Sequence, residues 1–277
     1  MPKALLKIPI FARRGLGQIL RGVLPLGLLR RFAPRNDRSS QEGLEGSKAA
    51  FTLAEVLLTL TIIGIIAAMT IPGLINNTQK TENVVALKKA YSTLMQATLM
   101  ITADTGGDIT SVLSGLTGNS DHDGFANVFI PKLNVTKNCG TASAKATGCF
   151  PNLQYKYLDG ITNWTNISTS MYHSTIILND GMSCAFYLQS LNCIDNYADP
   201  ATDTSSPLYN TCGGIRVDIN GPNKGPSVVG KDLFEFELTK KGIYPRGAYL
   251  DKWSDRDCSV YGWGCASKVL IEGAMNY

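Results

Sequence analysis

The chain has 277 residues, seven cysteines and a formal net charge of +4, a length that accommodates one membrane helix and one moderate globular domain. The positive charge comes from residues 1–50, which hold ten Lys and Arg and three Asp and Glu, a net of +7. Residues 51–277 hold sixteen Lys and Arg and nineteen Asp and Glu, a net charge of −3. This mildly acidic main part lacks the basic surface typical of nucleic-acid binding, so we expect no nucleic-acid partner.

Residues 1–50 form a basic leader. Five of its basic residues precede the following apolar run: Arg30, Arg31, Arg35, Arg38 and Lys48. This bias predicts a cytoplasmic N-terminus for the membrane helix behind it. We interpret the leader either as a segment that is cleaved off or as sequence ahead of the true start, with initiation near Leu44. A twin-arginine export signal at Arg13-Arg14 is disfavoured, because no small-residue cleavage site follows the apolar stretch behind it.

Residues 51–75 form an apolar run with a single charge, Glu55, near its start. As a helix at 1.5 Å per residue, the run spans roughly 37 Å, enough to cross a hydrocarbon core of about 30 Å. A carboxylate near the centre of that core costs about 2.5–3.5 kcal/mol, and less near its edge. The run therefore predicts a transmembrane helix in which Glu55 lies at the interface or meets a partner inside the membrane.

Residues 76–103 are more polar but keep the helical period. The apolar positions recur at spacings of three and four and form one stripe: Val84, Leu87, Tyr91, Leu94, Thr98 and Ile101. Lys88 and Lys89 face away from this stripe. The pattern predicts an amphipathic continuation of the same helix, from about Thr52 to Thr102. Pro72 and Gly73 predict a kink, because proline removes a backbone donor and crowds the preceding turn.

Residues 104–277 are rich in Gly, Ser, Thr, Asn and Asp, with short apolar runs between them. We predict strands at Leu153–Leu158, Ser174–Leu178, Met182–Leu188, Gly214–Ile219 and Leu233–Leu238. Asn179-Asp180-Gly181 is a hairpin turn signal between two of these strands. The sequence therefore predicts an α+β fold, in which a long N-terminal helix packs on an antiparallel β-sheet.

All seven cysteines lie beyond residue 75, which suits a domain outside the cytoplasm, where disulfides form. Their spacings suggest three local disulfides, Cys139–Cys149, Cys193–Cys212 and Cys258–Cys265. Each would close a short loop and contribute about 2–4 kcal/mol to stability. We expect Cys184 to be unpaired, because it lies in an apolar strand, where a free cysteine behaves as a small hydrophobe.

Two acidic loops are candidate Ca²⁺ sites, although we expect no required cofactor. Residues 121–124, Asp-His-Asp-Gly, present two carboxylates ahead of a glycine. In the second loop Asp218 and Asn220 supply oxygen ligands, and Asp232 could close the site. The alternative, that these are turn residues whose side chains make Asx hydrogen bonds, is favoured.

No catalytic constellation stands out, so we do not expect an enzyme. The two histidines, His122 and His173, lie in no recognisable catalytic motif, and we expect them to be solvated loop residues. Three aromatic residues near the C-terminus, Trp253, Tyr261 and Trp263, fill a thin core in the favoured interpretation. The alternative is an exposed binding patch.

A familiar motif surrounds the start of the apolar run. A small residue, Ala50, precedes Phe51, a glutamate is fifth counting from that Phe, and Pro72 interrupts the helix that follows. From Lys48 to about Ala97 the chain thereby resembles the N-terminal segment of type IV prepilins and of type II secretion pseudopilins. Members of this family are cleaved just before the Phe, and the residue before the cleavage site is usually Gly. This chain departs from the family in having Ala50 there.

The resemblance implies a pilin-like fold and a course of maturation. A prepilin peptidase would cut between Ala50 and Phe51, and the new N-terminus would be methylated. The protein would first be a single-pass inner-membrane protein and then a periplasmic or extracellular filament subunit. Its partners would be identical or related pilin subunits and the inner-membrane assembly machinery. Glu55 would pair with the Phe51 amino group of a neighbour in the filament.

Three functions follow from these observations. The first two are a subunit of a type II secretion pseudopilus and a subunit of a type IV pilus. The third is a membrane-anchored periplasmic binding module that uses a pilin-type helix as a tether. Major pseudopilins are similar in carrying a Ca²⁺ loop late in the domain, although their ligands do not match this chain one by one.

Overall fold

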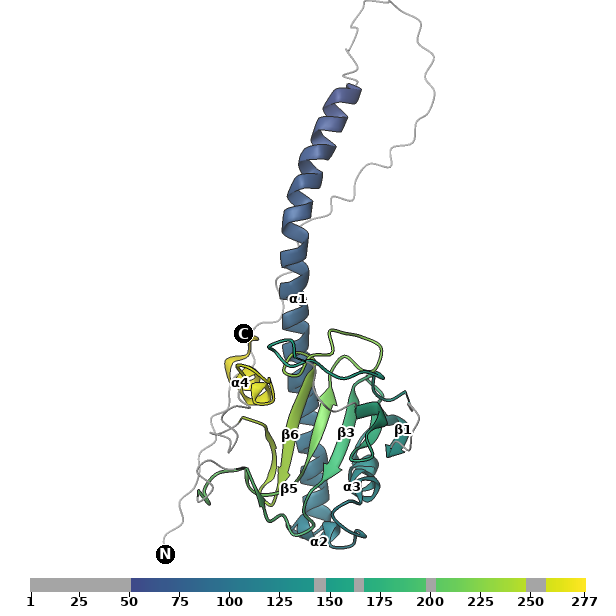
Figure 1. Cartoon of the computed structure of the whole chain (residues 1–277), viewed down its shortest axis with the longest axis vertical. Coiled ribbons are helices and arrows are strands. Elements are labelled where there is room, and N and C mark those ends of the chain that lie inside the picture. The colour runs from purple at the N-terminus through teal and green to yellow at the C-terminus, as the bar shows by residue number, and fades with distance from the viewer. Residues whose placement is uncertain (1–50, 142–147, 162–166, 198–202, 248–257) are drawn as a thin grey trace, which may run out of the picture. The chain divides into compact units, whose positions relative to one another are not determined.

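The computed structural model describes residues 51–141, 148–161, 167–197, 203–247 and 258–277. The chain divides into two units, Met1–Leu53 and Ala54–Tyr277. Apart from the first residue of α1, every helix and strand of the described residues belongs to the second unit (Figure 1). Its helices are α1 (Leu53–Asp104), α2 (Thr110–Leu113), α3 (His122–Phe129) and α4 (Cys265–Glu272). Its strands are β1 (Val135–Thr141), β2 (Ser174–Leu178), β3 (Ser183–Leu188), β4 (Asp195–Asn196), β5 (Tyr209–Asp218), β6 (Leu233–Thr239) and β7 (Gly242–Pro245).

Helix α1 is one continuous helix, as the sequence predicts. It runs through Pro72 without a break, and its ribbon curves gently in Figure 1. Its second half is buried along a single stripe: Asn83, Val84, Leu87, Ala90, Leu94, Ala97, Thr98 and Ile101. Tyr91 lies at the side of this stripe and stacks on Phe236, with ring centroids 5.7 Å apart.

The sheet is antiparallel, with the order β1-β2-β3-β5-β6-β7 and β4 paired to β5. An α+β fold built from a long helix and an antiparallel sheet is therefore confirmed. The predicted strands at Ser174–Leu178, Met182–Leu188, Gly214–Ile219 and Leu233–Leu238 correspond to β2, β3, β5 and β6. At the hairpin between β2 and β3, Gly181 has a φ of 90°, a conformation that favours glycine.

The predicted strand at Leu153–Leu158 is wrong. This segment pairs at one residue only, where Lys156 bridges to Val228. Its apolar residues have another role, since Tyr155 is fully buried in a cluster between the sheet and the loops. The chain then turns back, with Gly160 N–H donating to the Tyr157 carbonyl at 3.0 Å. In this segment, apolar and polar residues alternate as in a strand, although the segment is a loop that covers the sheet.

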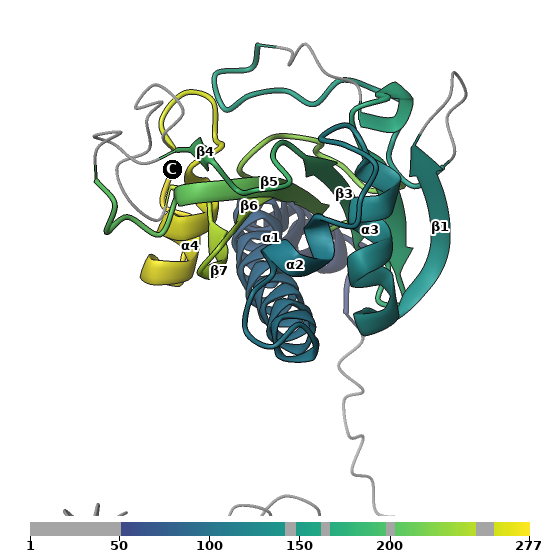
Figure 2. The same ribbon diagram turned by 90° about the horizontal axis from the view of Figure 1, so that it is seen from below.

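The two faces of the sheet are covered differently. Helices α1, α2 and α3 lie against one face, and loops cross the other (Figure 2). The larger core cluster joins the helices to inward residues of the strands, among them Phe186, Ile215 and Phe236. The smaller cluster packs Phe150, Tyr155, Ile167 and Trp263 with other residues on the loop-covered side. Both faces of the central strands β3, β5 and β6 are therefore largely buried.

The buried stripe of α1 predicts a sharp difference between two leucines of this helix. Leu87 is fully buried, whereas Leu99 is 62% exposed. Leu87→Ala should lower the free energy of unfolding by about 2–5 kcal/mol, because it leaves a cavity in the core. Leu99→Ala, the control, should change it by less than about 0.5 kcal/mol. Urea unfolding of the full chain in detergent measures both, and equal losses would contradict this packing.

Candidate functional site

The apolar segment, residues 51–75, is the most distinctive surface of the protein. Every residue in it is exposed except Ala67, which is half-buried. Phe51, Leu53 and Met69 are among its most exposed side chains, at 84%, 77% and 79%. Within the described part of the chain, α1 is the one helix long and apolar enough to cross a membrane. Figure 1 shows this half of α1 extending beyond the sheet.

The polar side chains of the apolar segment are compatible with a lipid environment. The hydroxyls of Thr59, Thr61 and Thr70 donate to backbone carbonyls three or four residues earlier in the helix, at 3.0, 2.7 and 3.0 Å. Lipid offers no hydrogen-bond partners, so groups that are satisfied within the helix carry no penalty there. Glu55 lies in the first turn of α1, where a negative charge interacts favourably with the helix dipole.

The residues expected to be processed lie at the very start of this segment. Ala50 lies outside the described residues, and Phe51 is the first described residue, two positions before α1 begins. A cut between them would leave Phe51 as a new N-terminus four residues ahead of Glu55.

The domain contains three disulfides, which join the pairs that the spacing suggests. Cys139 of β1 is bonded to Cys149, Cys193 to Cys212 of β5, and Cys258 to Cys265 of α4. Cys184 is free and fully buried, and burial raises the pKa of its thiol. A buried thiol with a raised pKa is a poor nucleophile, so Cys184 acts as a core side chain.

The Asp218 turn joins the end of β5 to the start of β6. Asp218 Oδ1 accepts hydrogen bonds from the backbone N–H groups of Asn220 and Gly221 at 2.9 and 3.0 Å, and the Tyr155 hydroxyl donates to Oδ2. The two bonds from backbone N–H groups are Asx-turn hydrogen bonds. The Asn220 side chain donates to the Gly225 carbonyl at 3.3 Å.

Asp232 lies beside this turn. Its carboxylate accepts the N–H groups of Ser227 and Val228 at 2.5 and 2.6 Å, and its carbonyl accepts from Ile219 N–H at 2.9 Å. The structure thus brings together Asp218, Asn220 and Asp232, the three residues of the predicted Ca²⁺ loop. Among the described residues no group of three or more His, Cys, Asp or Glu is arranged to hold a metal ion. Calcium binding at this turn stays a prediction.

The other acidic loop forms a helix cap. Asp121 Oδ1 accepts the Gly124 N–H at 2.8 Å at the start of α3, and Oδ2 accepts the Thr117 N–H at 3.0 Å. These two backbone bonds lower the pKa of Asp121. A Cβ at position 124 would lie 2.5 Å from the Asp121 carboxylate. Gly124 therefore leaves room for the Asp121 side chain to cap the N-terminus of α3. An Asp just before a helix is a typical N-cap residue, so the sequence contained a signal for this cap.

A buried ionic network on the loop-covered face was not predicted. Arg246 Nη1 lies 3.0 Å from Glu235 and 3.2 Å from Glu237, and Arg216 Nε lies 3.2 Å from Glu235. Both glutamates are fully buried. Burial alone would raise the pKa of Glu235, but the two arginines lower it to about 2. Because β6 alternates Phe and Leu with Glu, its pattern indicates a solvated face, which the loops in fact cover.

The expectation of solvated histidines is wrong. His122 and His173 are 7% and 4% exposed. His122 Nδ1 accepts the Leu188 N–H at 3.0 Å, and His173 Nε2 accepts from Arg216 at 2.9 Å. Burial lowers the pKa of both, and Arg216 adds to the effect on His173. As neutral hydrogen-bonding groups, His122 links the start of α3 to β3, and His173 links the loop before β2 to β5.

Trp263 belongs to the core, as the favoured interpretation holds, whereas Trp253 lies outside the described residues. The Trp263 ring also packs against the guanidinium of Arg216, whose Cζ lies 4.7 Å from the ring centroid.

Comparisons of the chain with protein-family models, with curated proteins and with solved structures find no match. We therefore describe the class of the protein from its own fold and from its exposed apolar segment. It is an α+β domain with disulfides, built on a helix whose other half is long and apolar enough to span a membrane.

The Asp218 turn predicts a characteristic dependence of stability on pH. Burial and the neighbouring Asp232 raise the pKa of Asp218 to about 7, from 3.8. The folded state therefore holds this proton more tightly than the unfolded state, and stability falls as pH rises from about 4 to about 7. Asp218→Asn should abolish this loss and raise the free energy of unfolding at pH 8, by up to about 4 kcal/mol.

Unfolding by urea at pH 4 and pH 8, in the presence of a chelator, measures this effect. Asp203→Asn is the matched control, because Asp203 Oδ1 accepts the Ser205 N–H at 2.9 Å in an exposed turn. Hydrogen bonds from Ser205 lower the pKa of Asp203, so no gain is expected. A gain for Asp218→Asn that is equal at both pH values would contradict the assignment.

Proposed function

We propose that the protein is a subunit of a helical, pilin-like filament, belonging to a type II secretion pseudopilus or to a type IV pilus. The observation that carries this proposal is the exposed apolar segment with one acidic residue, Glu55, in its first turn. The same helix continues into the core of a disulfide-containing domain. The resemblance to prepilins around Ala50, Phe51 and Glu55 supports the same conclusion.

An apolar surface of this size has to be buried away from water, and two environments can bury it. Lipid covers it while the subunit waits in the inner membrane. Neighbouring copies of the same helix cover it in a filament, where the helices bundle away from water. The two environments are equally apolar, so the transfer between them does not require the segment to enter water.

Glu55 distinguishes the two environments. In lipid, a carboxylate needs the interface or a partner. In a filament, the Phe51 amino group of a neighbour can supply that partner. Phe51 and Glu55 are four residues apart, which is about 6 Å along a helix axis. A neighbour displaced by about one turn therefore brings its Phe51 amino group next to Glu55, and the ion pair sets the register of the two helices.

This role for Glu55 predicts a separation of assembly from membrane insertion. Glu55→Ala should reduce filament yield by more than about tenfold, because removal of one partner from a buried ion pair costs about 3–5 kcal/mol. Membrane insertion should be unchanged, since the variant makes the segment more apolar. Glu82→Ala, a change of an exposed glutamate in the polar half of α1, is the control and should assemble normally.

Electron microscopy of sheared filaments and fractionation of membranes measure the two outcomes. Normal assembly of Glu55→Ala would refute the role of the ion pair. A wild-type protein that inserts but never forms filaments would instead support the alternative, a membrane-anchored binding module. The length of the filaments separates a secretion pseudopilus, which is short, from a surface pilus.

Maturation predicts a defined N-terminus. Mass spectrometry of the membrane-bound protein should find N-methylated Phe51, with residues 1–50 removed by the prepilin peptidase. Ala50→Gly should be processed, because glycine is the usual residue at this position in the family that the chain resembles. Ala50→Val should accumulate unprocessed, because its side chain is branched and larger. A mature protein that retains residues 1–50 would contradict processing.

A further inference from the structure

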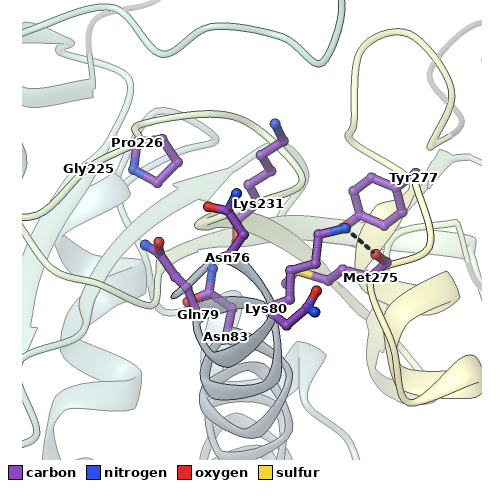
Figure 3. Close-up of a pocket in the computed structure, with 10 residues that line it drawn as sticks. Asn76, Gln79, Lys80, Asn83, Gly225, Pro226, Lys231, Met275 and Tyr277 are labelled. Atoms are coloured by element: carbon purple, nitrogen blue, oxygen red, sulfur yellow. Dashed lines mark hydrogen bonds between the residues drawn. The ribbon is translucent and has the colours of Figure 1, made fainter. Parts of the chain in front are cut away.

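A pocket lies where α1 leaves the apolar segment and meets the domain (Figure 3). Its volume is about 680 Å³. One wall is the polar face of α1, with Asn76, Gln79, Lys80 and Asn83. The other walls are the loop before β6, from Gly225 to Lys231, and the C-terminal residues Met275 and Tyr277. The lining is dominated by amide and ammonium donors.

Hydrogen bonds hold the three walls together. Lys80 Nζ donates to the Met275 carbonyl at 3.2 Å, which joins α1 to the C-terminal segment. Asn83 Nδ2 donates to the Lys231 carbonyl at 3.1 Å, which joins α1 to the loop. The Tyr277 hydroxyl donates to the Gly230 carbonyl and closes the third side. The pocket is therefore pre-formed, which lowers the entropic cost of binding.

The position of the pocket along α1 indicates its depth. The apolar segment ends at Ile75, and the lining begins at the next residue, Asn76. Residues 76–83 span roughly 10 Å along the helix. The headgroup layer outside a hydrocarbon core of about 30 Å is roughly 5–7 Å thick on each side. When the apolar segment spans a bilayer, the pocket lies at the level of the lipid phosphates.

The charged side chains that line the pocket, Lys80 and Lys231, favour an anion. Lys80 and Lys231 each carry a positive charge on an exposed side chain, and an ammonium has three N–H groups, of which Lys80 uses one for Met275. Glu82 is two residues from Lys80 and so points to another side of the helix. Glu272, near Tyr277, lies 4.0 Å from Lys268 and accepts from Asn276 at 3.3 Å.

From these observations we propose that this pocket binds the phosphodiester headgroup of an anionic phospholipid. Lys80 and Lys231 neutralise the phosphate, and the amides of Asn76 and Gln79 donate to its oxygens or to headgroup hydroxyls. The proposal rests on the membrane stage of the proposed function. A bound headgroup would hold the domain in one orientation on the membrane surface before assembly.

The test uses the full chain in nanodiscs of phosphatidylcholine, with or without phosphatidylglycerol. Native mass spectrometry counts the lipids that stay bound to the released protein. Phosphatidylglycerol should be retained in preference to phosphatidylcholine. Each lysine near an anionic surface contributes about a fivefold change in affinity, so Lys80→Gln should weaken retention about fivefold, and the double variant with Lys231→Gln about thirtyfold.

Two control variants separate lipid binding from folding and from general charge. Lys80→Arg keeps the charge and should retain the lipid. Lys240→Gln removes an exposed lysine from the turn between β6 and β7 and should behave as the wild type. Equal retention of both lipids, or an equal loss in Lys240→Gln and in the double variant, would overturn the proposal.

A further experiment measures whether inorganic phosphate binds to the protein in detergent without lipid. Binding with the same dependence on Lys80 and Lys231 would identify a soluble phosphate as the ligand and overturn the lipid assignment. Failure of the chain to enter nanodiscs would overturn both this proposal and the proposed function. Insertion without a preference for phosphatidylglycerol would overturn this proposal alone, since filament assembly is not needed for the measurement.

Discussion

The structure depends on one constraint, the apolar surface of residues 51–75. Fourteen large apolar side chains are exposed along it. At about 1.5–3 kcal/mol for each side chain, their burial is worth on the order of 20 kcal/mol or more. This exceeds the total stability of a typical domain, about 5–15 kcal/mol. The segment therefore determines where the protein can exist, because every stable state must cover it with lipid or with other apolar helices.

In the proposed filament subunit the domain has to be stable outside the membrane, although one of its central elements, α1, continues from the apolar segment. Two features provide this. The central strands of the sheet are buried on both faces, under helices on one side and under loops on the other. Three disulfides then restrain the loop-rich parts by closing short loops, with sequence separations of 10, 19 and 7 residues, and so lower the conformational entropy of the unfolded chain. The buried pairs of Glu235 and Glu237 with Arg246 join β6 to the residue that follows β7, and each charge has a partner there because an unpaired buried charge would be costly.

The parts of this fold that could be predicted from the sequence are those with a local period. The stripe from Val84 to Ile101 follows the helical repeat, and β2 and β3 are apolar runs bounded by turn residues. Strand β1 was missed because its residues, Val-Thr-Lys-Asn-Cys-Gly-Thr, are mostly polar, as suits an exposed edge. The burial of Glu235 and His173 could not be predicted, because it depends on loops that fold back over the sheet from distant parts of the chain. The closeness of Asp218 and Asp232 likewise follows from the register of β5 with β6.

The junction between the two halves of α1 couples the domain to the apolar segment. Lys80 and Asn83 bind main-chain carbonyls of the C-terminal segment and of the loop before β6. These contacts begin only a few residues after Ile75, and α1 crosses the junction without a break. A force on the apolar segment is therefore transmitted to the domain through a continuous helix and through hydrogen bonds that involve no residue of the segment itself. In the proposed function, the environment of residues 51–75 can therefore change from lipid to packed helices while the contacts of the domain stay the same.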